Sequence, residues 1–67
     1  MVRCYFFDRT GHIQSVELMD GTQLDHAVDR ATAILALRAH LHSFEIWDRA
    51  ERLYPEQPGD IRAARAG

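Results

Sequence analysis

The chain contains no lysine, and arginine alone supplies its eight positive charges against ten acidic residues, which leaves a net charge of −2. Nucleic-acid-binding proteins usually carry a basic excess gathered on one face, because contacts with phosphate dominate their affinity. Several of the arginines here directly follow an acid, as in Asp8-Arg9 and Asp48-Arg49. The composition therefore disfavours nucleic acid as a partner.

Cysteine is almost absent as well, and the single Cys4 excludes an intramolecular disulfide. Cys4 lies inside an apolar run, so we expect a buried, unreactive thiol. A chain of 67 residues hides only about 60% of its unfolded surface when it folds alone. Small chains usually gain the missing stability from disulfides, a metal or a partner subunit. Because a disulfide is excluded, the remaining sources of stability are a metal and a second copy of the chain.

Long hydrophobic runs are missing too. No apolar stretch approaches the ~20 residues of a membrane span. The N-terminal residues do not combine a charged region with a long apolar core, so no signal peptide is evident. These absences predict a soluble, cytoplasmic protein without a membrane partner.

Two extended stretches open the chain. Residues 2–8, VRCYFFD, are rich in aromatic and β-branched types, and residues 12–19, HIQSVELM, follow after a turn that contains Gly11. Such a pair predicts a β-hairpin. Residues 44–54, FEIWDRAERLY, repeat the arrangement around a turn without glycine. A duplication and common turn chemistry explain the repetition equally well.

One long helix is predicted between the hairpins, at roughly 22–41. Alanines favour a helix there, and Thr22 followed by Asp25 resembles a capping box. Apolar residues recur on one side with a period near 3.6, namely Leu24, Ala27, Val28, Ala31, Ile34, Leu35 and Leu41. Residues 1–54 then form a single domain, and the proline-containing residues 55–67 are predicted to be a flexible C-terminal tail.

The element order β-β-α-β-β predicts an α+β fold of two layers, with one helix packed on a four-stranded antiparallel sheet. The first and third strands are the most apolar, so we expect them at the centre, in the order 2-1-3-4, with polar strands at the edges. Alternation along these strands directs one set of side chains toward the helix, namely Cys4, Phe6, Phe44 and Ile46.

The opposite side of this sheet carries three large aromatic residues, Tyr5, Phe7 and Trp47, beside Arg3 and Glu45. No second helix is predicted to cover them, and an aromatic patch of this size is typical of an interaction site. A tail folded back over the patch, or aromatic pairs that only stiffen the sheet, would also account for it. Tyr5, Phe7 and Trp47 are the candidate interface residues.

The opening CYFFDRTGHI, the following DG, the alanine-rich helix and the closing FEIWDRAERL resemble a family of small uncharacterised proteins of rhizobia and related alphaproteobacteria. The resemblance covers residues 1–54, and Tyr5-Phe6-Phe7-Asp8 is its most specific part. The second half of the first hairpin departs from the family, since acids and glycine are sparse there. The resemblance implies the same fold and brings no activity, ligand or catalytic residue.

Catalytic, cofactor and metal sites are not predicted. His40 and His42 lack the spacing and the cysteine partners of a metal site, and a position at a helix end explains them. Asp8 and Asp48 would lie at opposite ends of the sheet, so we interpret them as turn formers rather than a catalytic pair. Arg38 lies within the apolar side of the helix, where we expect it to expose its guanidinium past the core; an ion pair with Glu45 or with a partner chain is the alternative.

The sequence therefore predicts a small non-enzymatic interaction module that forms a homodimer or binds another protein through the aromatic sheet face. An antitoxin-like module that binds a protein toxin is an alternative, because small antitoxins also begin with a β-β-α unit. Binding of single-stranded nucleic acid ranks below both. Aromatic sheets can stack RNA bases, but this chain lacks the accompanying basic motif.

Overall fold

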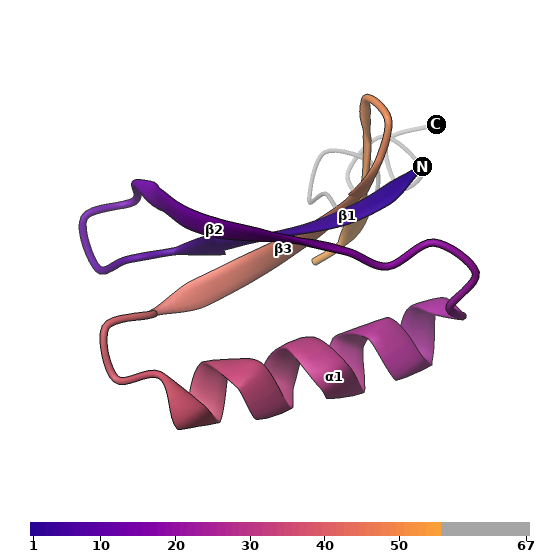
Figure 1. Cartoon of the computed structure of the whole chain (residues 1–67). Coiled ribbons are helices and arrows are strands. Elements are labelled where there is room, and N and C mark those ends of the chain that lie inside the picture. The colour runs from indigo at the N-terminus through magenta and orange to yellow at the C-terminus, as the bar shows by residue number, and fades with distance from the viewer. Residues whose placement is uncertain (56–67) are drawn as a thin grey trace, which may run out of the picture.

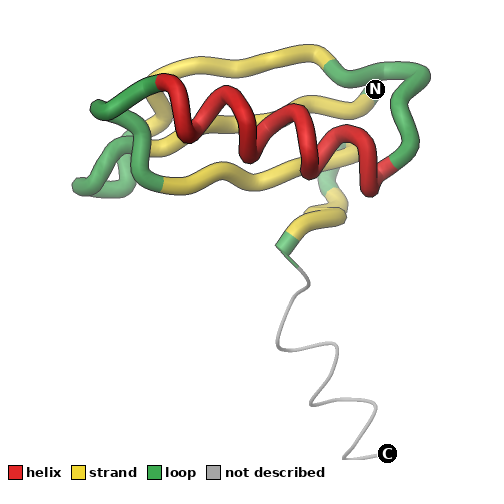
Figure 2. Tube along the Cα trace, turned by 90° about the horizontal axis from the view of Figure 1, so that it is seen from below, coloured by secondary structure: helices red, strands yellow, loops and turns green. Residues whose placement is uncertain are grey.

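The computed structural model describes residues 1–55, which form one helix and four strands (Figure 1). These elements are β1 (Val2–Phe7), β2 (Ile13–Leu18), α1 (Leu24–Leu37), β3 (Ser43–Asp48) and β4 (Glu51–Tyr54). The strands build one antiparallel sheet in the order β2-β1-β3-β4, and α1 lies along one of its faces (Figure 2). The predicted α+β fold and strand order are confirmed. The predicted tail, apart from Pro55, lies outside the described residues.

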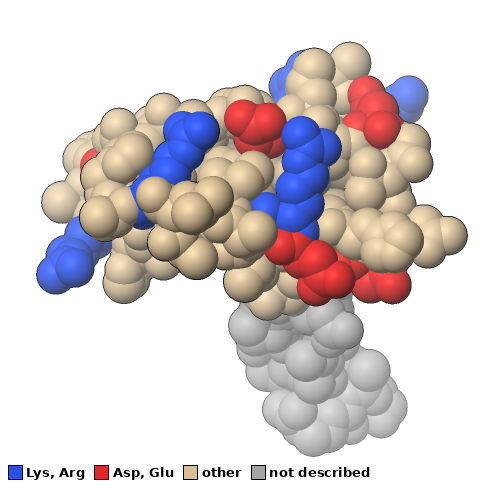
Figure 3. Space-filling view, turned by 60° about the horizontal axis from the view of Figure 1, so that its bottom comes forward, with Lys and Arg blue, Asp and Glu red and all other residues tan. Residues whose placement is uncertain are grey.

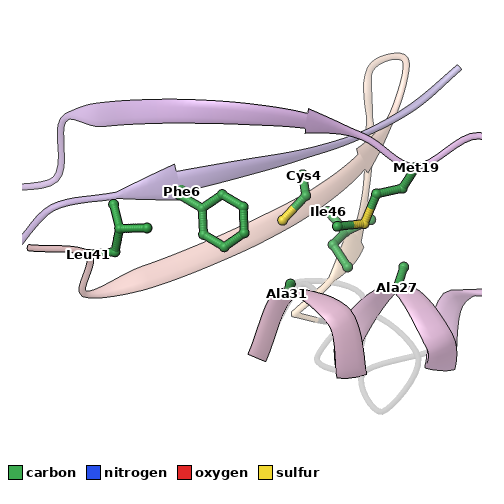
Figure 4. Packing of buried hydrophobic residues seen from close by; sticks show 7 residues of the cluster. All are labelled: Cys4, Phe6, Met19, Ala27, Ala31, Leu41 and Ile46. Carbon is green, nitrogen blue, oxygen red and sulfur yellow. The ribbon is translucent and has the colours of Figure 1, made fainter. Parts of the chain in front are cut away.

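The centre of the sheet supplies most of the core. Cys4 of β1 pairs with Ile46 of β3, and Phe6 pairs with Phe44. All four residues face α1 as predicted, and Cys4, Phe6 and Ile46 are fully buried (Figure 4). The rings of Phe6 and Phe44 lie 6.1 Å apart in a tilted arrangement, which is favourable for aromatic pairs. The two central strands are therefore joined by packing as well as by backbone hydrogen bonds.

The helix approaches the sheet through small residues. Ala27 and Ala31 are its buried positions, while Val28, Ile34 and Leu35 pack around the edge of the core. Small side chains let the helix backbone come close to the sheet, so the core is thin. The buried residues of the core are Cys4, Phe6, Met19, Ala27, Ala31, Leu41 and Ile46.

The predicted C-terminal limit of the helix was wrong. We expected the helix to reach residue 41, but Arg38 has an extended backbone (φ −124°, ψ 102°) and α1 ends at Leu37. A short turn follows, in which the Leu41 N–H donates to the Arg38 carbonyl. This turn brings Leu41 back into the core, where it is buried. The apolar periodicity included Leu41 because Leu41 is a core residue. It reaches the core from the loop after α1 and not from the helix itself.

The predicted capping box was also wrong. The N-cap of α1 is Gln23, and its side chain makes no capping hydrogen bond. The carboxylate of Asp25 instead accepts a hydrogen bond from the N–H of His26. Tertiary packing on the sheet therefore holds the start of this helix more than local capping does.

The first hairpin turn is organised by the side chain of Asp8. Its Oδ1 accepts hydrogen bonds from the N–H of Thr10 (2.9 Å), the hydroxyl of Thr10 (2.6 Å) and the N–H of His12 (3.1 Å), and its Oδ2 accepts one from Gln14 (2.7 Å). These bonds, the Thr10 hydroxyl foremost, hold the pKa of Asp8 well below its usual range. Gly11 takes the left-handed backbone conformation in this turn, with φ of 89°. Asp8 is thus a turn former, as the sequence predicted.

Candidate functional site

The face of the sheet turned away from α1, called the open face below, is covered by no other element of residues 1–55 (Figure 1). The strand register places its side chains in three rows that run across β3, β1 and β2. The rows are Trp47–Arg3–Leu18, Glu45–Tyr5–Val16 and Ser43–Phe7–Ile13. Tyr5, Phe7 and Trp47 therefore share one face, as predicted.

Strand β2 contributes more apolar surface to this face than the sequence interpretation allowed. Its three apolar side chains all lie on the open face, where Ile13 is 55%, Val16 46% and Leu18 59% exposed. The polar Glu17 pairs with Cys4 on the other side, 3.9 Å from Arg30 of the helix. The prediction of a polar edge strand was wrong for β2, because its polar residues point toward the helix layer.

A β-bulge explains why this pattern was missed. Phe6 pairs with Ser15 and Phe7 with Ile13, so Gln14 is an extra residue in β2. Without the bulge, Ile13 would share the side of Ser15 and face the helix layer. The extra residue moves Ile13 to the same face as Val16. Simple alternation could not reveal this, although an apolar residue three positions before another within one strand is a signal for a bulge.

Polar contacts fix Trp47 in place. Its indole N–H donates a hydrogen bond of 3.0 Å to Glu45 Oε1. Glu45 Oε2 lies 3.7 Å from Nη1 of Arg52 on β4, and both side chains of this pair are mostly buried. Arg38 is exposed at the end of the helix, as expected, and the alternative of a pair with Glu45 is not realised, since Glu45 pairs with Arg52. The Trp47–Glu45–Arg52 series presents the indole ring on a rigid support.

Two hollows lie on the open face, and both are lined by Tyr5, Trp47 and Arg49. The first, called the arginine hollow, has a volume of about 240 Å³ and is lined by Met1, Arg3, Tyr5, Trp47 and Arg49. The second, called the aromatic hollow, has a volume of about 290 Å³ and is lined by Tyr5, Phe7, Ile13, Glu45, Trp47 and Arg49. Arg49 belongs to the β3–β4 turn, which rises above the sheet on the side away from α1 (Figure 1).

Charge on the open face differs from that of the chain as a whole. Glu45 is paired with Arg52, whereas Arg3 and Arg49 form no ion pair with any residue of 1–55. The open face therefore carries an excess of positive charge in a chain whose net charge is −2. On the helix side, by contrast, basic and acidic side chains are interspersed (Figure 3). The sequence alone could not show this distribution of charge. Asp48 and Arg49 are adjacent in the chain, but Asp48 pairs with the amino group of Met1, whereas Arg49 lines the hollows of the open face.

The remaining titratable groups provide no second site within residues 1–55. No group of three potential metal-ligating side chains comes together there. Asp8 and Asp48 lie at opposite ends of the central strands, and Asp48 accepts a hydrogen bond from the amino group of Met1 instead of forming a turn bond. Cys4 is buried as expected, and burial, with a smaller contribution from Glu17, raises the pKa of its thiol to about 12.

No family model, curated protein or solved structure matches this chain. The resemblance to small alphaproteobacterial proteins accordingly stays a prediction. Among the described residues, the single helix is too short and too polar to cross a membrane. Within residues 1–55, the open face is where large apolar side chains, the hydrogen-bonded Trp47 ring and two arginines without an ion-pair partner lie together.

Proposed function

We propose that the protein is a small non-enzymatic interaction module that forms a homodimer through the open face of its sheet. The observation that carries this proposal is the orientation of β2. The apolar residues of β2 all point away from α1, so their burial contributes to stability only if something covers the open face. Tyr5, Phe7 and Trp47 extend the same apolar surface to the centre of the sheet.

A second copy of the chain is the partner that fits this surface best. The seven core residues include two alanines and a cysteine, so a single copy buries little large apolar volume. Pairing two open faces would supply the burial that a chain of this length lacks, in an isologous contact with two-fold symmetry. The apolar side chains on β1 and β2 would meet those of the other copy, with Arg3 and Arg49 at one end of the face.

The size of the face sets the expected strength of the dimer. Strands of up to six residues extend about 20 Å at most, since β4 has only four, and four strands at a spacing of about 4.8 Å span about 19 Å. The resulting footprint of about 400 Å² is roughly half of the ~800 Å² per partner in a standard interface. We therefore expect a weak, reversible dimer with a dissociation constant in the micromolar range rather than an obligate one.

Sedimentation equilibrium tests the proposal directly, with Trp47 fluorescence as a second readout because Trp47 is the only tryptophan. Wild-type protein should pass from monomer to dimer over the micromolar range, and its tryptophan emission should shift to shorter wavelength as the dimer forms. Trp47→Ala should weaken the dimer. A wild-type chain that stays monomeric at high micromolar concentration, with quenchable Trp47, would contradict it and favour a different protein partner, such as the toxin of an antitoxin-like system.

Binding of single-stranded nucleic acid is the second candidate, and the arginines of the open face are the observation in its favour. Within residues 1–55 only Arg3 and Arg49 on this face are free of a carboxylate, whereas tight binders neutralise many phosphates. We expect no binding of single-stranded RNA at physiological salt. A clear micromolar titration that weakens in Trp47→Ala would contradict this expectation.

A further inference from the structure

Arg49 has a backbone conformation that its residue type does not favour. It is the first central residue of the two-residue β3–β4 turn, with φ of 56°, and no other described residue except glycine has a positive φ. Glycine or asparagine would take this position at lower cost. Strained backbone often persists where the side chain it presents has a function.

Arg49 lines both hollows of the open face together with Tyr5 and Trp47. In the arginine hollow it is joined by Arg3, whose Nη2 donates a hydrogen bond of 3.4 Å to the Met1 sulfur. No carboxylate lines this hollow, and neither arginine has an ion-pair partner in residues 1–55. Two arginines thus line one cavity that has no carboxylate among its lining residues.

We infer that the arginine hollow binds a small ligand in which an anionic group is joined to a planar ring. Guanidinium groups form their strongest hydrogen bonds with phosphate and carboxylate, often through two parallel N–H donors. The Tyr5 and Trp47 rings offer flat apolar surfaces against which a ring can stack. The hydrogen bond from the Trp47 indole to Glu45 holds one of these surfaces in a fixed orientation before any ligand arrives.

The size of the hollow limits the ligand. A volume of about 240 Å³ is below the ~300 Å³ at which typical small-molecule pockets begin, so a single ring with one anionic substituent is the appropriate class. Phosphate and carboxylate share the chemistry that the two arginines recognise. All lining residues belong to one copy of the chain, so the site is complete in a monomer and does not depend on the proposed dimer.

The test uses phenyl phosphate and benzoate as probes, with phenol and inorganic phosphate as probes that carry only the ring or only the anion. Binding is followed by the fluorescence of Trp47, the only tryptophan, which can be measured on submicromolar protein. Protein is kept well below the concentration at which it dimerises, since Tyr5 and Trp47 also belong to the proposed interface. At least one combined probe should bind roughly tenfold more tightly than either partial probe. The ratio between the two combined probes then identifies the preferred anion.

Variants assign the binding to this hollow. Arg3→Gln and Arg49→Gln should each weaken the combined probe roughly tenfold. Arg9→Gln, at an exposed arginine in the β1–β2 turn, is the matched control and should leave binding unchanged. Combined probes that bind no better than phosphate alone would overturn the inference, as would an equal loss of binding in Arg9→Gln. A chain that never dimerises would contradict the proposed function but leave this titration fully readable.

Discussion

Replacing Arg49 by glycine should stabilise the fold. A residue with a Cβ loses roughly 1–2 kcal/mol in the left-handed region, and Arg49 lies there with φ of 56°. Glycine removes that strain but gives the unfolded chain more freedom, which costs about 0.4–1 kcal/mol. The net gain in the free energy of unfolding should be about 0.5–1 kcal/mol, or roughly 2–8 °C in melting temperature for a domain of this size.

Two further variants separate backbone strain from loss of the arginine side chain. Arg49→Ala removes the guanidinium but keeps the Cβ in the left-handed region, so it should be less stable than Arg49→Gly by the same 0.5–1 kcal/mol, approximately. Ala50→Gly changes the neighbouring turn residue, which has no positive φ, and should lose about 0.4–1 kcal/mol. Thermal unfolding is measured at one protein concentration, because self-association makes the midpoint concentration-dependent. Equal stability of Arg49→Gly and Arg49→Ala would refute the reasoning.

Three other predictions concern the core and the titrating groups. Ala31→Leu should lower the free energy of unfolding in urea by about 1–3 kcal/mol, because Ala31 is buried against the sheet. Ala33→Leu, on the exposed side of the helix, should change it little. Similar losses in both variants would contradict the close packing of the helix. The pKa of Cys4 is raised in the folded protein from 9.0 to about 12. Its contribution to stability should therefore be complete below pH 9 and decline between pH 9 and 12. Urea midpoints should show this decline for the wild type and not for Cys4→Ala. The folded pKa of Asp8 is lowered, so its contribution should be present above its ordinary pKa of 3.8 and be lost as pH falls below that value; a carboxyl carbon NMR titration of Asp8 with a midpoint near 3.8 would contradict this.

The fold was predictable because hydrophobic periodicity and turn residues agreed along most of the chain. Alternation in the first and third strands correctly identified Cys4, Phe6 and Ile46 as core residues, and the strand order followed from placing the most apolar strands centrally. Helix ends were less predictable. The chain leaves the helix at Arg38 because a turn can bury Leu41, and that is a tertiary effect which residue propensities do not contain.

The candidate site was predictable only in part. Alternation placed Tyr5, Phe7 and Trp47 together, since it acts within regular strands. Alternation does not place Ile13 of β2 on the open face, because the bulge at Gln14 reverses the pattern there. The position of Arg49 could not be predicted either, because the β3–β4 turn, which rises on the side of the sheet away from α1, places it in the hollows with Tyr5 and Trp47 (Figure 1).

Charge introduced at one position on each side of the molecule tests the proposed dimer most directly. Val16→Glu places a carboxylate in the middle row of the open face, and Leu37→Glu places one at the most exposed apolar residue of the helix, 85% accessible. In sedimentation equilibrium, wild type and Leu37→Glu should show the same micromolar dimer, whereas Val16→Glu should stay monomeric. Both variants are exposed in the monomer and should keep its fold, which far-UV circular dichroism checks. A Val16→Glu chain that dimerises as well as wild type, or a Leu37→Glu chain that does not, would contradict self-association through the open face.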